Sequence, residues 1–111
     1  MPMSGSNLQR VTARPDAAEQ ALIIEVSGPF NLDVHRDFRR AYESQGQRFA
    51  RYTVNLKQCT AVDSTGLGML LLLRDYSQLE KDDLLITHCS RDVRMVLRYA
   101  SFDQLFTIHS A

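Results

Sequence analysis

The sequence predicts an α/β fold with a mixed, mostly parallel sheet and helices packed on it. Three observations support this class. Short apolar runs typical of strands alternate with segments of helical periodicity, the connections are short, and the first two apolar runs follow each other without a helix between them. Because strand–helix–strand units form right-handed crossovers, the later strands are expected to lie parallel, after an N-terminal β-hairpin.

The hairpin is predicted from two strands and the turn between them. Residues 8–13 are expected to form an edge strand, and residues 14–19 contain a Pro-Asp pair that suits a turn. Residues 21–26 are almost wholly apolar, as expected of a strand covered on both faces. Gly28 and Pro29 should end this strand.

Helices and strands are then expected to alternate. A helix capped by Asn31 or Asp33 should end near Gly46, because apolar residues recur at helical spacing between them. Residues 51–56 form the next predicted strand, and residues 57–63 form the loop that leaves its carboxyl end.

A long helix is predicted from Ser64, followed by a buried strand over 84–89, a helix capped by Ser90, and a last strand over 105–109. The long helix carries so wide an apolar face that much of its first half is expected to be buried. The leucines of this face are Leu67, Leu70, Leu71, Leu72 and Leu73.

Length and charge limit the function classes. The chain has 111 residues, with 13 basic and 13 acidic side chains and a formal net charge of zero. This length suits one domain, expected over residues 8–111 after a flexible leader over 1–7. Zero net charge removes the electrostatic argument for binding nucleic acid or an anionic membrane. It also gives little charge repulsion between copies of the chain, so a weak homodimer is compatible with this composition. No secretory signal or membrane span is evident, so we expect a cytoplasmic protein without direct membrane insertion.

No metal or cofactor site is predicted. Cys59 and Cys89 lack a C-x-x-C spacing and are expected to be reduced core thiols. The three histidines are scattered, without metal-ligand spacing. An arginine-rich stretch is expected to be a solvated face, or alternatively a basic patch for an acidic partner. Its members are Arg36, Arg39, Arg40, Arg48 and Arg51.

The loop after the third strand carries the most specific signal. In α/β sheets, function gathers where loops leave the carboxyl ends of strands, and residues 58–68 hold an acid, hydroxyls and two glycines at a helix start. Asp63 or Ser64 should lie near the N-cap, with free N–H groups that would tolerate a phosphoryl group on the serine. Gly66 and Gly68 each cost about 1 kcal/mol of helix stability relative to Ala, which indicates close approach of another backbone or a partner. The alternative is a plain capped helix with a tightly packed first turn.

Catalytic interpretations of this loop fail on particular residues. A nucleophile elbow requires Gly two positions before the serine, where Val62 stands. An aspartic-protease triplet requires one hydroxyl residue between Asp and Gly, and here there are two. A receiver domain requires an acidic pair after an early strand, where Ser27 and Gly28 stand, and no phosphate-binding G-x-x-x-x-G-K occurs. We therefore predict no enzyme, no catalytic residue and no cofactor.

The segment from Asp63 to Gly68, after a short strand and before an apolar helix, resembles the signature of STAS domains. It resembles in particular the single-domain anti-sigma factor antagonists of the SpoIIAA kind. The predicted order of strands and helices is similar to that fold over nearly the whole chain. The resemblance implies a STAS fold and a bacterial signalling protein of the partner-switching type that regulates transcription.

The resemblance also implies roles for residues and partners. Ser64 would be phosphorylated by an anti-sigma factor that is a serine kinase, with Thr65 as the alternative acceptor. A PP2C-type phosphatase, in some cases fused to a response-regulator domain, would reverse the reaction. The unphosphorylated protein would bind the anti-sigma factor and release a sigma factor. A non-phosphorylated accessory subunit of a lipid transporter or signalling complex is the alternative. The residues expected to support the phosphosite and form the partner-binding loop are Asp63, Thr65, Gly66, Leu67, Gly68 and Met69.

Overall fold

The computed structural model describes residues 9–110. After an initial hairpin, its helices alternate with the strands of one five-stranded sheet, as predicted, and two short strands are added. In chain order they are β1 (Val11–Asp16), β2 (Ala21–Val26), β3 (Gly28–Phe30), the 3-10 turn η2 (Leu32–Val34), α1 (His35–Glu43), β4 (Arg51–Asn55), β5 (Cys59–Val62), α2 (Ser64–Ser77), η3 (Lys81–Asp83), β6 (Leu84–Cys89), α3 (Arg91–Tyr99), η4 (Phe102–Gln104) and β7 (Thr107–Ser110).

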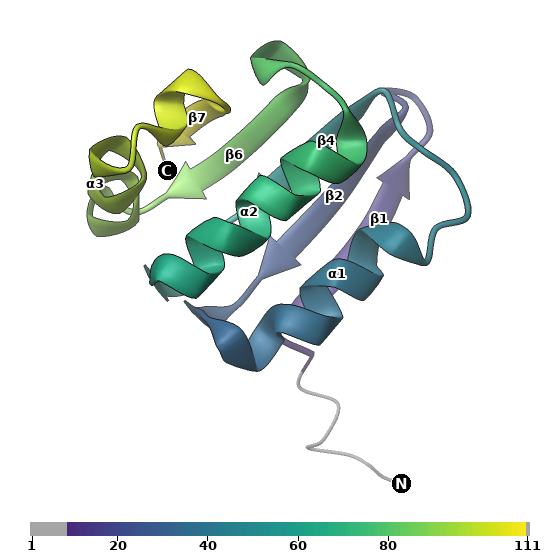
Figure 1. Cartoon of the computed structure of the whole chain (residues 1–111). Coiled ribbons are helices and arrows are strands. Elements are labelled where there is room, and N and C mark those ends of the chain that lie inside the picture. Colours follow the sequence, from purple (N-terminus) through teal and green to yellow (C-terminus); the bar gives the residue numbers. More distant parts are fainter. Residues whose placement is uncertain (1–8, 111) are drawn as a thin grey trace, which may run out of the picture.

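Five of these strands form the main sheet, in the order β1-β2-β4-β6-β7. β1 is antiparallel to β2, and the other neighbours are parallel. Figure 1 shows α1 and α2 next to each other across one face of this sheet, and α3 lies beside β6 and β7. The predicted mixed, mostly parallel sheet with helices packed on it is confirmed.

One hydrophobic core lies between the sheet and the helices. Leu22, Ile24 and Val26 alternate along β2 as fully buried side chains, whereas Ile23 is only half-buried and Glu25 is exposed. β4 shows the same alternation, and β6 shows it from Leu84 to Thr87. The expectation that the second strand is covered on both faces is therefore wrong. The apolar run gave no sign that the helices cover one face alone.

The hairpin is displaced along the sequence from its predicted place. β1 ends at Asp16, so Pro15, expected in the turn, lies in the strand opposite Leu22. A proline is tolerated there because β1 is an edge strand of the main sheet. The turn instead occupies residues 17–20, and Leu8, expected in the first strand, lies outside the described residues.

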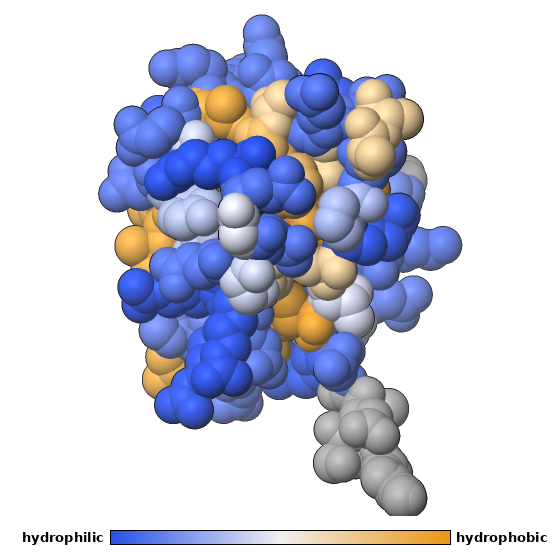
Figure 2. Space-filling model, turned by 90° about the vertical axis from the view of Figure 1, so that its right-hand side faces the viewer, coloured by the Kyte–Doolittle hydropathy of each residue, from blue (hydrophilic) through white to orange (hydrophobic). Residues whose placement is uncertain are grey.

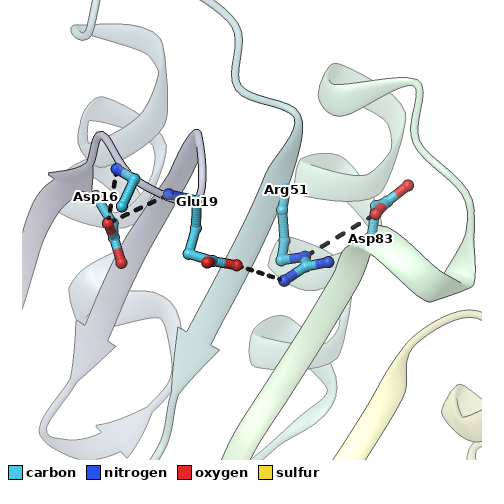
Figure 3. Close-up of polar contacts among 5 residues, drawn as sticks. Asp16, Glu19, Arg51 and Asp83 are labelled. Carbon is cyan, nitrogen blue, oxygen red and sulfur yellow. Dashed lines mark hydrogen bonds and ion pairs between the residues drawn. The ribbon is translucent and has the colours of Figure 1, made fainter.

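Charged side chains tie the turn to the neighbouring strands at the amino ends of β4 and β6 (Figure 3). The Asp16 carboxylate accepts hydrogen bonds from the N–H groups of Ala18 at 3.1 Å and Glu19 at 3.4 Å. The Arg51 guanidinium lies 3.3 Å from Glu19 and 3.9 Å from Asp83. This end of the sheet is the one opposite the helix start at Ser64.

A second, two-stranded sheet replaces what the sequence predicted as a strand end and a loop. β3 and β5 pair in parallel, and the N–H of Gly28 donates to the Gln58 carbonyl at 2.9 Å. Gly28 has a φ of +74°, which glycine adopts without strain. These strands contain only three and four residues, too few for an alternation pattern to identify them.

The remaining boundaries differ from prediction by a few residues. Asn31 caps the 3-10 turn η2 rather than α1, by accepting from the N–H of Asp33 at 3.0 Å. The last strand starts at Thr107 instead of residue 105, because η4 takes up the preceding residues. Ser90 caps α3 as predicted, by accepting from the N–H of Val93 at 3.2 Å.

Candidate functional site

α2 starts at the carboxyl end of the β3–β5 sheet, and Asp63 is its N-cap. One carboxylate oxygen of Asp63, Oδ1, accepts three hydrogen bonds. The donors are the N–H of Thr65 at 2.9 Å, the N–H of Gly66 at 3.0 Å and the Thr65 hydroxyl at 2.6 Å. This cap fixes the direction in which the chain enters the helix.

These hydrogen bonds lower the pKa of Asp63. The Thr65 hydroxyl contributes most, followed by the N–H of Gly66, because both donors stabilise the carboxylate form. Asp63 is therefore charged at neutral pH. Its carboxylate also occupies the N–H groups of Thr65 and Gly66 that the sequence led us to expect free for a phosphoryl group. A phosphate on Ser64 would meet a negative neighbour there.

The two hydroxyl residues of the loop differ in what their hydroxyls do. Ser64 and Thr65 are both exposed, and Ser64 is the first residue of α2. The Thr65 hydroxyl donates to Asp63 and so helps to hold the cap. Modification of Thr65 would break that hydrogen bond, whereas modification of Ser64 would leave the cap intact.

The two glycines of the loop differ in whether internal packing requires a residue without a side chain. A Cβ on Gly66 would lie 2.3 Å from the Phe30 carbonyl oxygen and 3.1 Å from Val62, so the first turn of α2 packs directly on β3. The predicted close approach of another backbone is thus confirmed at Gly66. A Cβ on Gly68 would meet nothing within 4 Å, so no packing inside the described chain requires glycine there.

The apolar residues of α2 divide differently from prediction. Met69 is buried, with 3% of its surface exposed, and belongs to the core, whereas the sequence led us to expect it in the partner-binding loop. Leu67 is half-buried against the core. Leu71 and Leu72 are 42% and 49% exposed, although the sequence predicted them to be buried.

Leu71 and Leu72 follow Gly68 by three and four residues and Ser64 by seven and eight, which places all four on one side of the helix. We call Leu71 and Leu72 the apolar ridge. Leu32, 66% exposed, follows β3, the strand whose Phe30 carbonyl lies against Gly66. A signal in the sequence could have revealed that this side of the helix is exposed, because the polar residues Ser64 and Asp75 lie on it before and after the ridge.

Two findings place the chain among known proteins. Residues 13–107 match the family described as "Mlab, STAS domain". A STAS-domain containing protein of Pseudomonas aeruginosa (strain UCBPP-PA14) is 44% identical over 98 residues, which cover 88% of this chain and 97% of that protein. The chain belongs to the STAS domain family.

Solved structures show the same STAS fold at low sequence identity. The anti-sigma factor antagonist SpoIIAA in its unphosphorylated form has a TM-score of 0.59 and 16% identity, over 80% of this chain and 82% of that one. A sulfate transporter family protein from Wolinella succinogenes has a TM-score of 0.66 and 16% identity, over 81% of this chain and 76% of that one. Similar folds thus occur in an anti-sigma factor antagonist and in a sulfate transporter family protein.

The thiols of this STAS domain are both buried and free. Burial is the main reason why the pKa of both thiols is raised. The pKa of Cys89 is raised to about 11. Both groups are therefore neutral at physiological pH, as expected of core thiols. Among residues 9–110, no three side chains of the types His, Cys, Asp and Glu lie together in a way that could hold a metal ion.

The arginines of the basic stretch do not form one patch. Arg36, Arg39 and Arg40 are exposed on α1, whose side of the molecule is mostly hydrophilic with small, separate apolar areas (Figure 2). Arg48 lies over the ring of Tyr76, 4.5 Å from its centroid, and Arg51 lies between Glu19 and Asp83. The expected solvated face thus holds for the arginines of α1. Within the described part of the chain, no helix has the length and apolar character that a membrane span requires.

Proposed function

We propose that this STAS domain is an anti-sigma factor antagonist without catalytic activity, controlled by phosphorylation of Ser64. In this proposal it binds an anti-sigma factor that is also a serine kinase, in the bacterial cytoplasm. The observation that carries it is the exposed Ser64 at the first position of α2, beside a charged Asp63 and on the same side of the helix as the apolar ridge. The SpoIIAA-like fold supports the same role.

The partner surface proposed here combines the helix start with the apolar ridge. A partner that covers Leu71 and Leu72 gains the free energy of burying apolar surface, about 25 cal/mol for each Å². Gly68, between Ser64 and the ridge, lets that partner approach the helix backbone, which gives a reason for a glycine that internal packing does not require.

Phosphorylation would turn this surface off through charge. The kinase transfers the terminal phosphoryl group of ATP to the Ser64 oxygen, the hydroxyl proton is released and ADP leaves. A PP2C-type phosphatase hydrolyses the phosphoester to serine and inorganic phosphate. The phosphoserine adds about −1.5 to −2 charges beside the Asp63 carboxylate. Desolvating these charges without a compensating cation costs several kcal/mol, so the partner loses affinity by orders of magnitude.

The experiment uses the full chain with its cognate kinase and ATP, and counts phosphates by mass spectrometry. The wild type and Thr65→Ala should each gain one phosphate, and Ser64→Ala should gain none. Ser64→Asp should weaken binding of the kinase while its circular dichroism stays that of the wild type. Equal labelling of Ser64→Ala, or undiminished affinity of Ser64→Asp, would contradict the proposal.

The second candidate is a non-phosphorylated accessory subunit of a transporter or multiprotein complex. It is favoured by the fold shared with the sulfate transporter family protein. The same surface would then bind a transporter component permanently. Co-purification with a membrane ATPase, together with the absence of phosphorylated protein in cells, would support this candidate over the first.

A further inference from the structure

A cationic trough runs along β7, away from the Ser64 site. Its volume is about 350 Å³, and it is open to solvent. The lining residues come from η3, α3, η4 and β7, with the residue before β7: Lys81, Arg94, Arg98, Asp103, Phe106, Thr107, Ile108 and Ser110.

β7 is an edge strand of the main sheet. One side of its backbone therefore faces no further strand of the described chain, and an extended peptide could pair with it. The opposite edge strand, β1, contains Pro15, which has no N–H to donate. β7 contains no proline, so each of its residues has both a donor and an acceptor.

The charge of the trough is strongly positive for a chain of zero net charge. Lys81, Arg94 and Arg98 face a single acid, Asp103. Within residues 9–110, none of these three cations belongs to an ion pair. Arg94 Nη1 donates to the Ser110 hydroxyl at 2.5 Å, which holds this guanidinium beside the end of the strand.

The trough also has an apolar floor. Phe106 is buried, with 1% of its surface exposed, and its ring stacks with that of Phe102 at a centroid distance of 5.8 Å. Ile108 is half-buried on the same strand. A peptide in extended conformation would place every second side chain toward the trough, because side chains alternate along a strand.

We propose that the cationic trough binds an extended, acidic segment of a partner protein, which pairs with β7 as a sixth strand of the main sheet. Backbone hydrogen bonds to β7 provide affinity, and carboxylates at alternate positions of the segment meet Lys81 and Arg98. A trough that is open to solvent beside a free strand edge suits a peptide better than a small anion, since small-molecule sites enclose most of the ligand surface. This inference is independent of the proposed function of Ser64.

The test measures fluorescence anisotropy of the full chain with a labelled peptide, Glu-Val-Asp-Val-Glu-Val. The wild type should bind it saturably, and the peptide with lysine at each acidic position should not bind. The double variant Lys81→Glu with Arg98→Glu should lose at least about tenfold in affinity. The matched control reverses Arg36 and Arg40, two exposed arginines of α1, to glutamate, and should bind as the wild type does.

Backbone pairing is tested with two further peptides, N-methylated at one or the other alternate set of amides. One of the two should lose at least about tenfold in affinity and the other less, because alternate amides of an added strand point toward β7. Ser64→Asp should bind the peptide unchanged. If both methylated peptides bind as tightly as the unmethylated peptide and inorganic phosphate competes with them, the trough binds small anions and the proposal is wrong. No saturable binding, or equal weakening by the α1 control, would also overturn it.

Discussion

At the residue scale, the loop before α2 is organised by hydrogen bonds and close contacts of single groups. Asp63 Oδ1 collects three donors, and Gly66 lets the helix backbone rest on the Phe30 carbonyl. Ser64 stands next to both without taking part in either contact. Its modification would therefore change the charge of the surface and leave the local fold in place.

The two glycines give a matched pair of variants. Gly66→Ala should lower the free energy of unfolding by about 3 kcal/mol, because its Cβ would overlap the Phe30 carbonyl oxygen. Gly68→Ala should raise it by up to about 1 kcal/mol, because its Cβ meets open space and alanine favours the helix. Urea unfolding followed by circular dichroism measures both. Similar values for the two variants would refute the packing assignment.

The cap at Asp63 predicts a dependence of stability on pH. Its pKa is lower in the folded than in the unfolded chain, so its stabilisation is present above the ordinary pKa and is lost as the pH falls below about 4. The melting temperature of Asp63→Ala should thus lie below that of the wild type at pH 7, and the difference should shrink at acid pH. Asp63→Asn keeps an acceptor without the titration, so its melting temperature should lie closer to that of the wild type than the melting temperature of Asp63→Ala does, and the pH-dependent part of the difference should be the same for both variants.

At the element scale, α2 serves the core with one side and the proposed partner with the other. Leu70 and Leu73 are fully buried, whereas the apolar ridge of Leu71 and Leu72 faces solvent. Exposed leucines on a helix that begins at the candidate phosphosite are expected where a partner docks. The two sides should respond differently to substitution.

Leu70→Ala should lower the free energy of unfolding by about 2 to 5 kcal/mol, because it leaves a cavity in the core. Leu71→Ser and Leu72→Ser should each change it by less than about 0.5 kcal/mol. The two serine variants should nevertheless weaken binding of the anti-sigma partner, measured by isothermal titration calorimetry. Wild-type affinity of both would remove the ridge from the proposed surface.

The Arg51 cluster should act on stability alone, since it lies at the end of the sheet away from Ser64. Its ion pairs are partly exposed, with 39% of the Arg51 side chain accessible, so Arg51→Ala should cost no more than about 1 kcal/mol. Thermal unfolding measures this loss, which should decrease as salt is added. Partner binding should remain that of the wild type, and a loss of binding would show that the two ends are coupled.

At the scale of the whole molecule, a single core lies between one face of the sheet and the helices. Both thiols lie in this core. Their exposure therefore requires the core to open, and they report on global unfolding.

Native protein at pH 8 should react slowly with a disulfide reagent such as dithionitrobenzoate, because burial raises the pKa of both thiols, that of Cys89 to about 11. Two thiols per chain should react rapidly in denaturant. Rapid reaction of the native protein would show local opening near β5 or β6. Cys59→Ser and Cys89→Ser would identify the reacting thiol.

The sequence by itself determined the fold class, the order of elements and the position of Ser64 at a helix start. The fold class and the order of elements follow from signals that are local in the sequence: apolar runs such as 84–89, helical periodicity, and caps such as Ser90. The tertiary structure decided which apolar residues are buried. Met69 lies in the core and Leu71 outside it, because burial depends on where α2 rests on the sheet.

Only the tertiary structure brought together groups that are distant in the chain. The β3–β5 pairing, the contact of Gly66 with Phe30 and the cationic trough around β7 each join separate segments through long-range contacts. No residue pattern within one segment encodes such contacts, since each depends on how whole elements pack. The sequence therefore indicated the candidate phosphosite, and the packing of the elements decided which surfaces surround it.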